Sequence, residues 1–146
     1  MENVNWLSMV IATFIPMIVG FIYYNPKVFG NVWMKSLGIT EEDIKKRNML
    51  KTYGIAIVMS FILAFFLTNF NNSPGQEGEF DTFKHGAFHG LILTIFIAIP
   101  ILMTNGLFEL KNLKNIFINI GYWLITLVLM GGVLDVMNHW PNAMPT

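Results

Sequence analysis

The sequence predicts an all-α integral membrane protein, a four-helix bundle of two antiparallel transmembrane hairpins that forms one domain over residues 1–146. Of its 146 residues, 54% are hydrophobic and 12% are charged, whereas soluble globular chains are about 45–50% apolar and about 25% charged. Four apolar stretches are each long enough for the roughly 20 residues that a helix needs to cross a bilayer. The basic residues gather in alternate loops, which is the charge pattern of a multi-pass membrane protein.

The four expected spans cover residues 4–24, 52–70, 86–108 and 116–136. The first span follows Glu2 without a basic segment or a small-residue cleavage site, so we do not interpret it as a cleaved signal peptide. Pro16 and Pro100 lie in the middle of spans one and three. Each removes a backbone hydrogen bond, and we expect each to kink its helix.

The distribution of lysine and arginine predicts that both termini face outside. Every basic residue except Lys84 lies in the first or the third loop, and basic residues near span ends stay cytoplasmic. Those residues are Lys27, Lys35, Lys45, Lys46, Arg47, Lys51, Lys111 and Lys114. Aromatic residues fit the same frame as interface anchors, with Trp6 and Trp140 outside and Tyr24 and Trp33 inside.

The first cytoplasmic loop is expected to hold a short interfacial helix over residues 28–37. Asn25-Pro26 ends the first span, because the residue before proline avoids the helical region. Apolar residues then recur at helical spacing up to Gly38, which ends the segment. Thr40 and the acids after it indicate the start of a second helix of two to three turns that could continue into span two.

Several classes of function are unsupported by the sequence. With no cysteine, the chain has no disulfide, thiolate metal site or cysteine nucleophile. It contains no phosphate-binding loop, nucleophile elbow or zinc-protease motif. No basic stripe with interleaved aromatics indicates a nucleic-acid partner. The expected partners are the lipid bilayer and further copies of the chain.

Two polar or small-residue patterns lie near the ends of the last two spans. Gly86 and Gly90 form a GxxxG pattern, which serves either close packing within one chain or dimerisation. Asn105 and Glu109 are one helical turn apart near the inner end of span three, and Asn119 lies near the inner end of span four. These three residues are candidates for an inner polar cluster.

The sharpest candidate site is formed by the histidines, since His85, His89 and His139 all fall at the predicted outer face. His85 and His89 share one face of span three, and Asp135 and His139 share one face of span four, because each pair is four residues apart. An ionised carboxylate near the hydrocarbon is costly and needs a partner. We expect His89, at the same predicted depth, to be the partner of Asp135.

Three interpretations of the set His85, His89, Asp135 and His139 remain open. Imidazoles and a carboxylate suit zinc or another divalent ion, with His85, His89 and His139 as ligands, although no cofactor is otherwise evident. The same groups could form a proton-titrating or hydrogen-bonded polar site. The plainest alternative is that interfacial histidines only anchor in the headgroups.

The chain also resembles a known family of small bacterial membrane proteins, domain of unknown function 1761. The N-terminal resemblance rests on Tyr24-Asn25-Pro26, Phe29-Gly30, Trp33-Met34 and Gly38-Ile39-Thr40-Glu41-Glu42, together with Trp6 and Gly20. The C-terminal resemblance rests on His89-Gly90, Asn119-Ile120-Gly121-Tyr122-Trp123 and Met130-Gly131. It implies four membrane helices in a bacterial inner membrane and no established activity. Asp135 is expected to lie just beyond the matching segment.

The function that these patterns favour is binding or passage of a small solute or ion by a homo-oligomer. Four helices barely enclose a pathway, so transport favours assembly around a symmetry axis. One alternative is an accessory or scaffold protein whose basic loop meets anionic lipid or a partner. Another is a membrane-embedded enzyme or cofactor binder that uses polar groups at its outer end.

Overall fold

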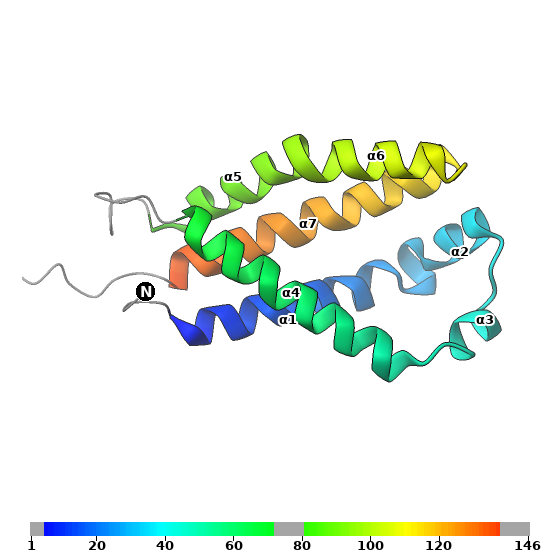
Figure 1. The fold of residues 1–146 in the computed structure, drawn as a ribbon, viewed down its shortest axis with the longest axis horizontal. Coiled ribbons are helices and arrows are strands. Elements are labelled where there is room, and N and C mark those ends of the chain that lie inside the picture. The colour runs from blue at the N-terminus through cyan, green and yellow to red at the C-terminus, as the bar shows by residue number, and fades with distance from the viewer. Residues whose placement is uncertain (1–4, 72–80, 138–146) are drawn as a thin grey trace, which may run out of the picture.

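The computed structural model describes residues 5–71 and 81–137, and every contact reported below lies within these ranges. This part of the chain is helical and contains no strand. Its long helices are α1 (Trp6–Tyr23), α4 (Met49–Asn71), α5 (Phe83–Leu93) with η2 (Thr94–Ala98) and α6 (Ile99–Phe108), and α7 (Leu113–Met137). α5, η2 and α6 form one helix of 26 residues, and each of the four helices is long and apolar enough to cross a membrane. One such helix covers most or all of each of the four predicted spans (Figure 1).

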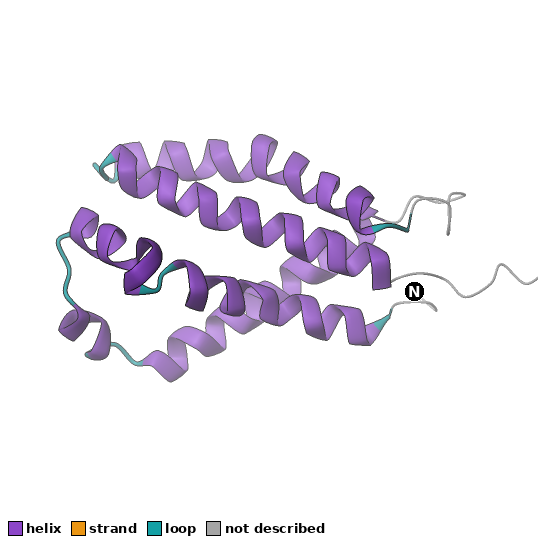
Figure 2. Cartoon of the chain, turned by 180° about the vertical axis from the view of Figure 1, so that it is seen from behind, coloured by secondary structure: helices purple, strands orange, loops and turns teal. Residues whose placement is uncertain are grey.

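The helices run antiparallel in sequence order, so their ends gather at two poles. α1 begins, α4 ends, α5 begins and α7 ends at one pole, which we name the outer end after the predicted topology (Figures 1 and 2). The opposite pole, or inner end, carries the α6–α7 turn and the short helices after α1. Which pole faces outside stays a prediction.

The segment between α1 and α4 contains three short elements: η1 (Pro26–Gly30), α2 (Asn31–Leu37) and α3 (Glu41–Lys45). η1 and α2 confirm the helix expected over residues 28–37, and Gly38 ends it in the left-handed region at φ 66°. The placement of this helix in the headgroup layer stays a prediction.

The prediction of a longer helix after Thr40 is wrong. α3 has five residues and is separate from α4. The physical reason is an N-cap at Asn48, whose side chain accepts a hydrogen bond from the Lys51 amide. This cap begins α4 as a new helix.

α7 is the central helix of the bundle, and it packs against α1, α4 and the α5–α6 helix. Most of the core lies toward the outer end, where α1, α4 and α7 meet at Met9, Ala12, Ala64, Leu67 and Met130, all fully buried. α4 crosses the other helices obliquely and moves away from α6 toward the inner end (Figure 1). The bundle is therefore closed at its outer end and open along one side farther in.

Close backbone contact between α5 and α7 depends on glycine. A Cβ atom on Gly86 would collide with the Gly131 carbonyl, and one on Gly90 would collide with the Leu127 carbonyl. Small residues four apart allow this approach. The GxxxG pattern thus serves packing within one chain, and it fixes the register between the two helices that carry the histidines and Asp135.

Candidate functional site

A cluster of polar side chains from three helices lies at the outer end. α4 supplies Asn71 at its last residue, α5 supplies His85 and His89, and α7 supplies Asp135. Asp135 is 1% exposed and Asn71 is 5% exposed. Buried polar groups of this kind need hydrogen-bond partners. The cluster therefore depends on all three helices meeting at one point.

Two hydrogen bonds connect these residues across the helices. His85 Nδ1 lies 3.0 Å from Asp135 Oδ2, and His89 Nδ1 lies 2.9 Å from Asn71 Oδ1. The two imidazole rings are in contact, with centroids 4.3 Å apart. The side chain of His85 is 31% exposed, so the cluster opens toward the outer surface.

The hydrogen-bond network determines which ring nitrogens carry protons. Asn71 Nδ2 donates to the Gly131 carbonyl at 3.2 Å, which fixes Asn71 Oδ1 as the acceptor facing His89. An ionised Asp135 carboxylate is likewise an acceptor facing His85. In their neutral forms both histidines therefore donate from the Nδ1 N–H, and Nε2 is the ring nitrogen that carries the lone pair.

We expected His89 to be the partner of Asp135, but the structure pairs Asp135 with His85. The cause is the glycine contact between α5 and α7. A Cβ atom on Gly86 would approach Asp135 Cβ as well as the Gly131 backbone. Asp135 therefore lies at the level of Gly86. His85, the residue before Gly86, is then close enough to bond to Asp135. Sequence spacing alone could not supply this offset between two helices.

Two further residues of the outer end were not among the predicted site residues. Asn71 holds His89, and Asn5 donates from Nδ2 to the carbonyl of Met137 at 2.7 Å, which ties the start of α1 to the end of α7. Asn5 also caps α1 by accepting from the amides of Leu7 and Ser8. A polar residue that ends an apolar span, as Asn71 does, was the available signal.

The three-histidine metal set is only partly within the described residues. His139 and the anchor Trp140 lie outside them. Among residues 5–71 and 81–137 no group of three metal-ligating side chains comes together. The described part of the site thus offers two imidazoles, with Asp135 and Asn71 positioned behind them.

The expected inner polar cluster is divided by the structure. Asn119 accepts a hydrogen bond from the Tyr24 hydroxyl at 2.9 Å and donates to Asn115 Oδ1 at 3.1 Å. Fully buried Asn115 in turn donates to Ser36 Oγ at 3.0 Å. Asn105 is exposed, and Glu109 pairs with Lys111 at the α6–α7 turn. Asn119 is therefore bonded to Tyr24, at the end of α1, and to Asn115 of α7, and not to Asn105 or Glu109.

Two of the predicted interface anchors, Tyr24 and Trp33, make aromatic contacts at the inner end. The ring of Tyr24 lies 5.2 Å from that of Trp33 and 5.2 Å from that of Tyr122. These side chains join the end of α1 and helix α2 to α7. Trp6, in contrast, is 63% exposed at the outer end, as an interface anchor would be.

Comparison with known proteins identifies the family. Neither a curated protein nor a solved structure matches the chain. A family model matches residues 7–135, a range that includes both described histidines and extends through Asp135 instead of stopping before it. The Tyr24-Asn25-Pro26 segment and Tyr122, which carried the resemblance, meet in the aromatic contacts of the inner end. The chain belongs to the family described as protein of unknown function (DUF1761).

Proposed function

We propose that this protein binds a small cation, a divalent transition metal ion, at the outer end of its membrane bundle. The observation that carries the proposal is a pair of neighbouring imidazoles on α5, in contact with each other and each held through Nδ1 by a polar side chain from another helix. Histidines that bind metals commonly donate a hydrogen bond from the N–H of their other ring nitrogen to a carboxylate or a carbonyl, which fixes the tautomer and the ring orientation. Asp135 and Asn71 occupy those supporting positions.

A metal ion would complete its coordination from further groups. Zinc sites usually have four ligands, and catalytic or transport sites leave positions for water or substrate. Two imidazoles four residues apart on a helix supply the first two ligands. His139, two residues beyond the described end of α7, is our proposed third ligand. Glu79 and Asp81, in the segment before α5, supply negative charge that attracts a cation.

Binding is tested by calorimetric titration of Zn²⁺ into the protein in lipid nanodiscs, with an affinity tag that contains no histidine. His85→Gln and His89→Gln should each abolish binding, and Asp135→Asn should weaken it about 10–100-fold, as loss of a supporting partner does. Lys84→Gln, a neighbouring exposed position, is the control and should bind normally. Unchanged binding in the double histidine variant would remove the site.

We further propose that passage of the cation requires assembly of several copies. The buried interior of the described residues is mainly apolar, and the buried carboxylate of Asp135 lies at its outer end. Zinc flux into proteoliposomes, measured with an enclosed fluorescent indicator, should accompany an oligomeric particle in light scattering. A monomer without flux would limit the function to binding.

The proposed location is a bacterial inner membrane with both termini outside. The support is the concentration of basic residues in the two inner-end segments. Cysteines introduced at positions 77 or 144 should react with an impermeant thiol reagent in intact cells, and cysteines at 45 or 112 only after lysis. The reverse labelling pattern would invert the topology and place the histidine cluster inside.

A further inference from the structure

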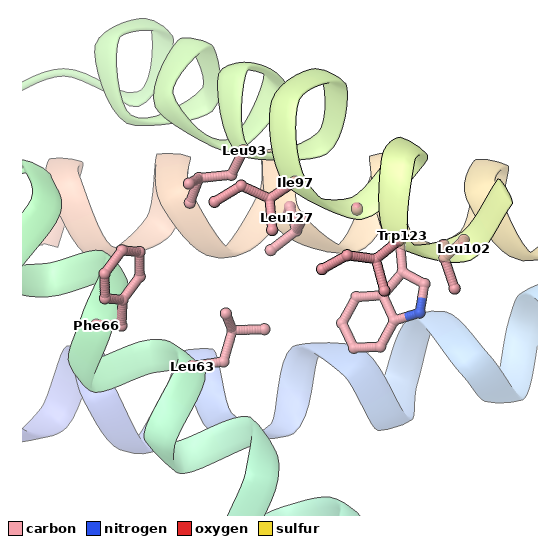
Figure 3. Close-up of a pocket in the computed structure, with 9 residues that line it drawn as sticks. Leu63, Phe66, Leu93, Ile97, Leu102, Trp123 and Leu127 are labelled. Atoms are coloured by element: carbon pink, nitrogen blue, oxygen red, sulfur yellow. The ribbon is translucent and has the colours of Figure 1, made fainter. Parts of the chain in front are cut away.

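An apolar groove lies between α4 and the α5–α6 helix, with α7 as its floor. Its volume is about 410 Å³. α4 contributes Leu63 and Phe66, the opposite helix contributes Ile97 and Ala98, and α7 contributes Trp123 and Leu127. Figure 3 shows the labelled side chains of these three helices facing a common space. The groove lies midway along helices that are long enough to span a bilayer.

The wide turn η2 shapes one wall of this groove. η2 is a π-helical segment, in which the Ile99 amide donates to the Thr94 carbonyl, and Pro100 is the second residue of α6, which follows it. Such bulges are rare and occur frequently at functional sites. Ile97 and Ala98, which line the groove, belong to this turn. The small side chain of Ala98 leaves room where a larger residue would fill the groove.

The groove is suited neither to hold water nor to stay empty. An ordered water molecule needs two to four polar partners, and the lining residues supply only apolar surface apart from the edge of Trp123. An empty apolar space of about 410 Å³ would leave its lining without packing partners, which is unfavourable. The occupant is therefore hydrocarbon.

The dimensions decide between two hydrocarbon occupants. A helix at least 10 Å across with a 1.5 Å rise displaces on the order of 100 Å³ per residue. The groove would thus hold only about one turn of a helix from a second copy. We propose that it holds instead one acyl chain of a bilayer phospholipid, which enters from the side where α4 and α6 separate.

The groove also indicates which leaflet supplies the lipid. Phe66 and Leu93 line its outer part, and one helical turn farther out lie Phe70 and His89, whose rings are 5.1 Å apart. Phe66 stacks on Phe70 with ring centroids 5.8 Å apart. These ring contacts close the outer end of the groove, so an acyl chain would reach it from the inner leaflet, on the side where α4 and α6 separate.

The experiment uses Trp123 as a reporter in the full-length chain. Replacing Trp6, Trp33 and Trp140 by phenylalanine leaves Trp123 as the only tryptophan. This parent is reconstituted with phosphatidylcholine brominated in the middle of its acyl chains, and bromine quenches an indole that it contacts. Ala98→Phe is made to fill the groove. Ile95→Phe is the matched control, since Ile95 is 45% exposed and does not line the groove.

The proposal expects strong quenching of Trp123 in the parent and in Ile95→Phe, and loss of the quenching in Ala98→Phe. Native mass spectrometry should show one tightly retained phospholipid that is absent from Ala98→Phe. An unquenched Trp123 in the folded parent overturns the proposal, and a dimeric particle would then identify a second copy as the occupant. Equal quenching in Ala98→Phe and the parent also overturns it, because ordinary contact with surrounding lipid would account for the signal.

Discussion

Replacing Gly86 by alanine should both loosen the bundle and break the outer site. The new Cβ would lie 2.5 Å from Asp135 Cβ and 2.6 Å from the Gly131 carbonyl carbon. Carbon atoms pack at about 3.5–4.0 Å, so α5 and α7 would have to separate by roughly 1 Å. Backbone atoms cannot rotate away as a flexible side chain can. The His85–Asp135 bond, now 3.0 Å, would then exceed hydrogen-bonding distance.

Two terms set the expected loss of stability. Overpacking of a close contact costs about 1–3 kcal/mol, and loss of a hydrogen bond to a charged group costs about 1.5–3 kcal/mol. Because the two effects share one displacement and are not additive, we expect about 2–4 kcal/mol for Gly86→Ala. Gly132→Ala should cost less, since its Cβ meets the movable ring of Phe83.

Gly54 provides the matched control for these substitutions. Among the residues that the structure describes, no atom outside its own stretch of helix backbone lies within 4 Å of a Cβ built on Gly54. Gly54→Ala should therefore leave the free energy of unfolding unchanged or raise it by up to about 1 kcal/mol, from helix propensity alone. Unfolding is followed by circular dichroism during titration with dodecyl sulfate in mixed micelles. A Gly86→Ala protein within about 0.5 kcal/mol of the wild type would refute the close-packed register.

Two smaller predictions concern the inner end. Tyr24→Phe removes the donor to Asn119 and should lower the free energy of unfolding by about 1 kcal/mol in the same assay, whereas Tyr53→Phe at an exposed position should not. The Thr40 hydroxyl holds the pKa of Asp43 below its ordinary value, so this bond stabilises the ionised form and is lost as the pH falls below about 4, through the lowered pKa. Thr40→Ala should raise the pKa of Asp43 toward its ordinary value in an NMR titration of the carboxylate, and an unchanged pKa would contradict the capping role.

The sequence could predict the spans because their length and apolar character are properties of single helices. It could not predict the partner of Asp135, because that depends on the offset between α5 and α7. The offset follows from Gly86 and Gly131 meeting backbone to backbone, and GxxxG spacing gives no information about which glycine on the other helix it meets. A shift of one helical turn is enough to exchange His89 for His85.

At the inner end, too, the sequence could not predict which side chains from different helices bond to one another. Asn119 was a candidate because it is polar within an apolar span, but its neighbours Asn105 and Glu109 were chosen by predicted depth alone. The structure joins Asn119 to Tyr24 and Asn115 instead. Asn115 is one helical turn before Asn119, so this contact was predictable from spacing. The contact with Tyr24 depends on where α1 ends against α7, which no local pattern contains.

If both proposals hold, filling the groove should strengthen cation binding. α4 places Asn71 against His89 at the outer end. Farther toward the inner end, α4 moves away from α6 (Figure 1). An acyl chain between Phe66 and Leu93 would support α4 at the distance that keeps Asn71 Oδ1 on His89 Nδ1. Zinc affinity should therefore fall when the phospholipid is replaced by a short-chain detergent and recover when lipid is restored. Asn71→Ala should lower the zinc affinity in lipid. It should also remove most of the dependence of that affinity on phospholipid, because an acyl chain in the groove would then have no Asn71 side chain to hold against His89. An equal dependence on lipid in Asn71→Ala and the wild type would show that the groove does not act through Asn71.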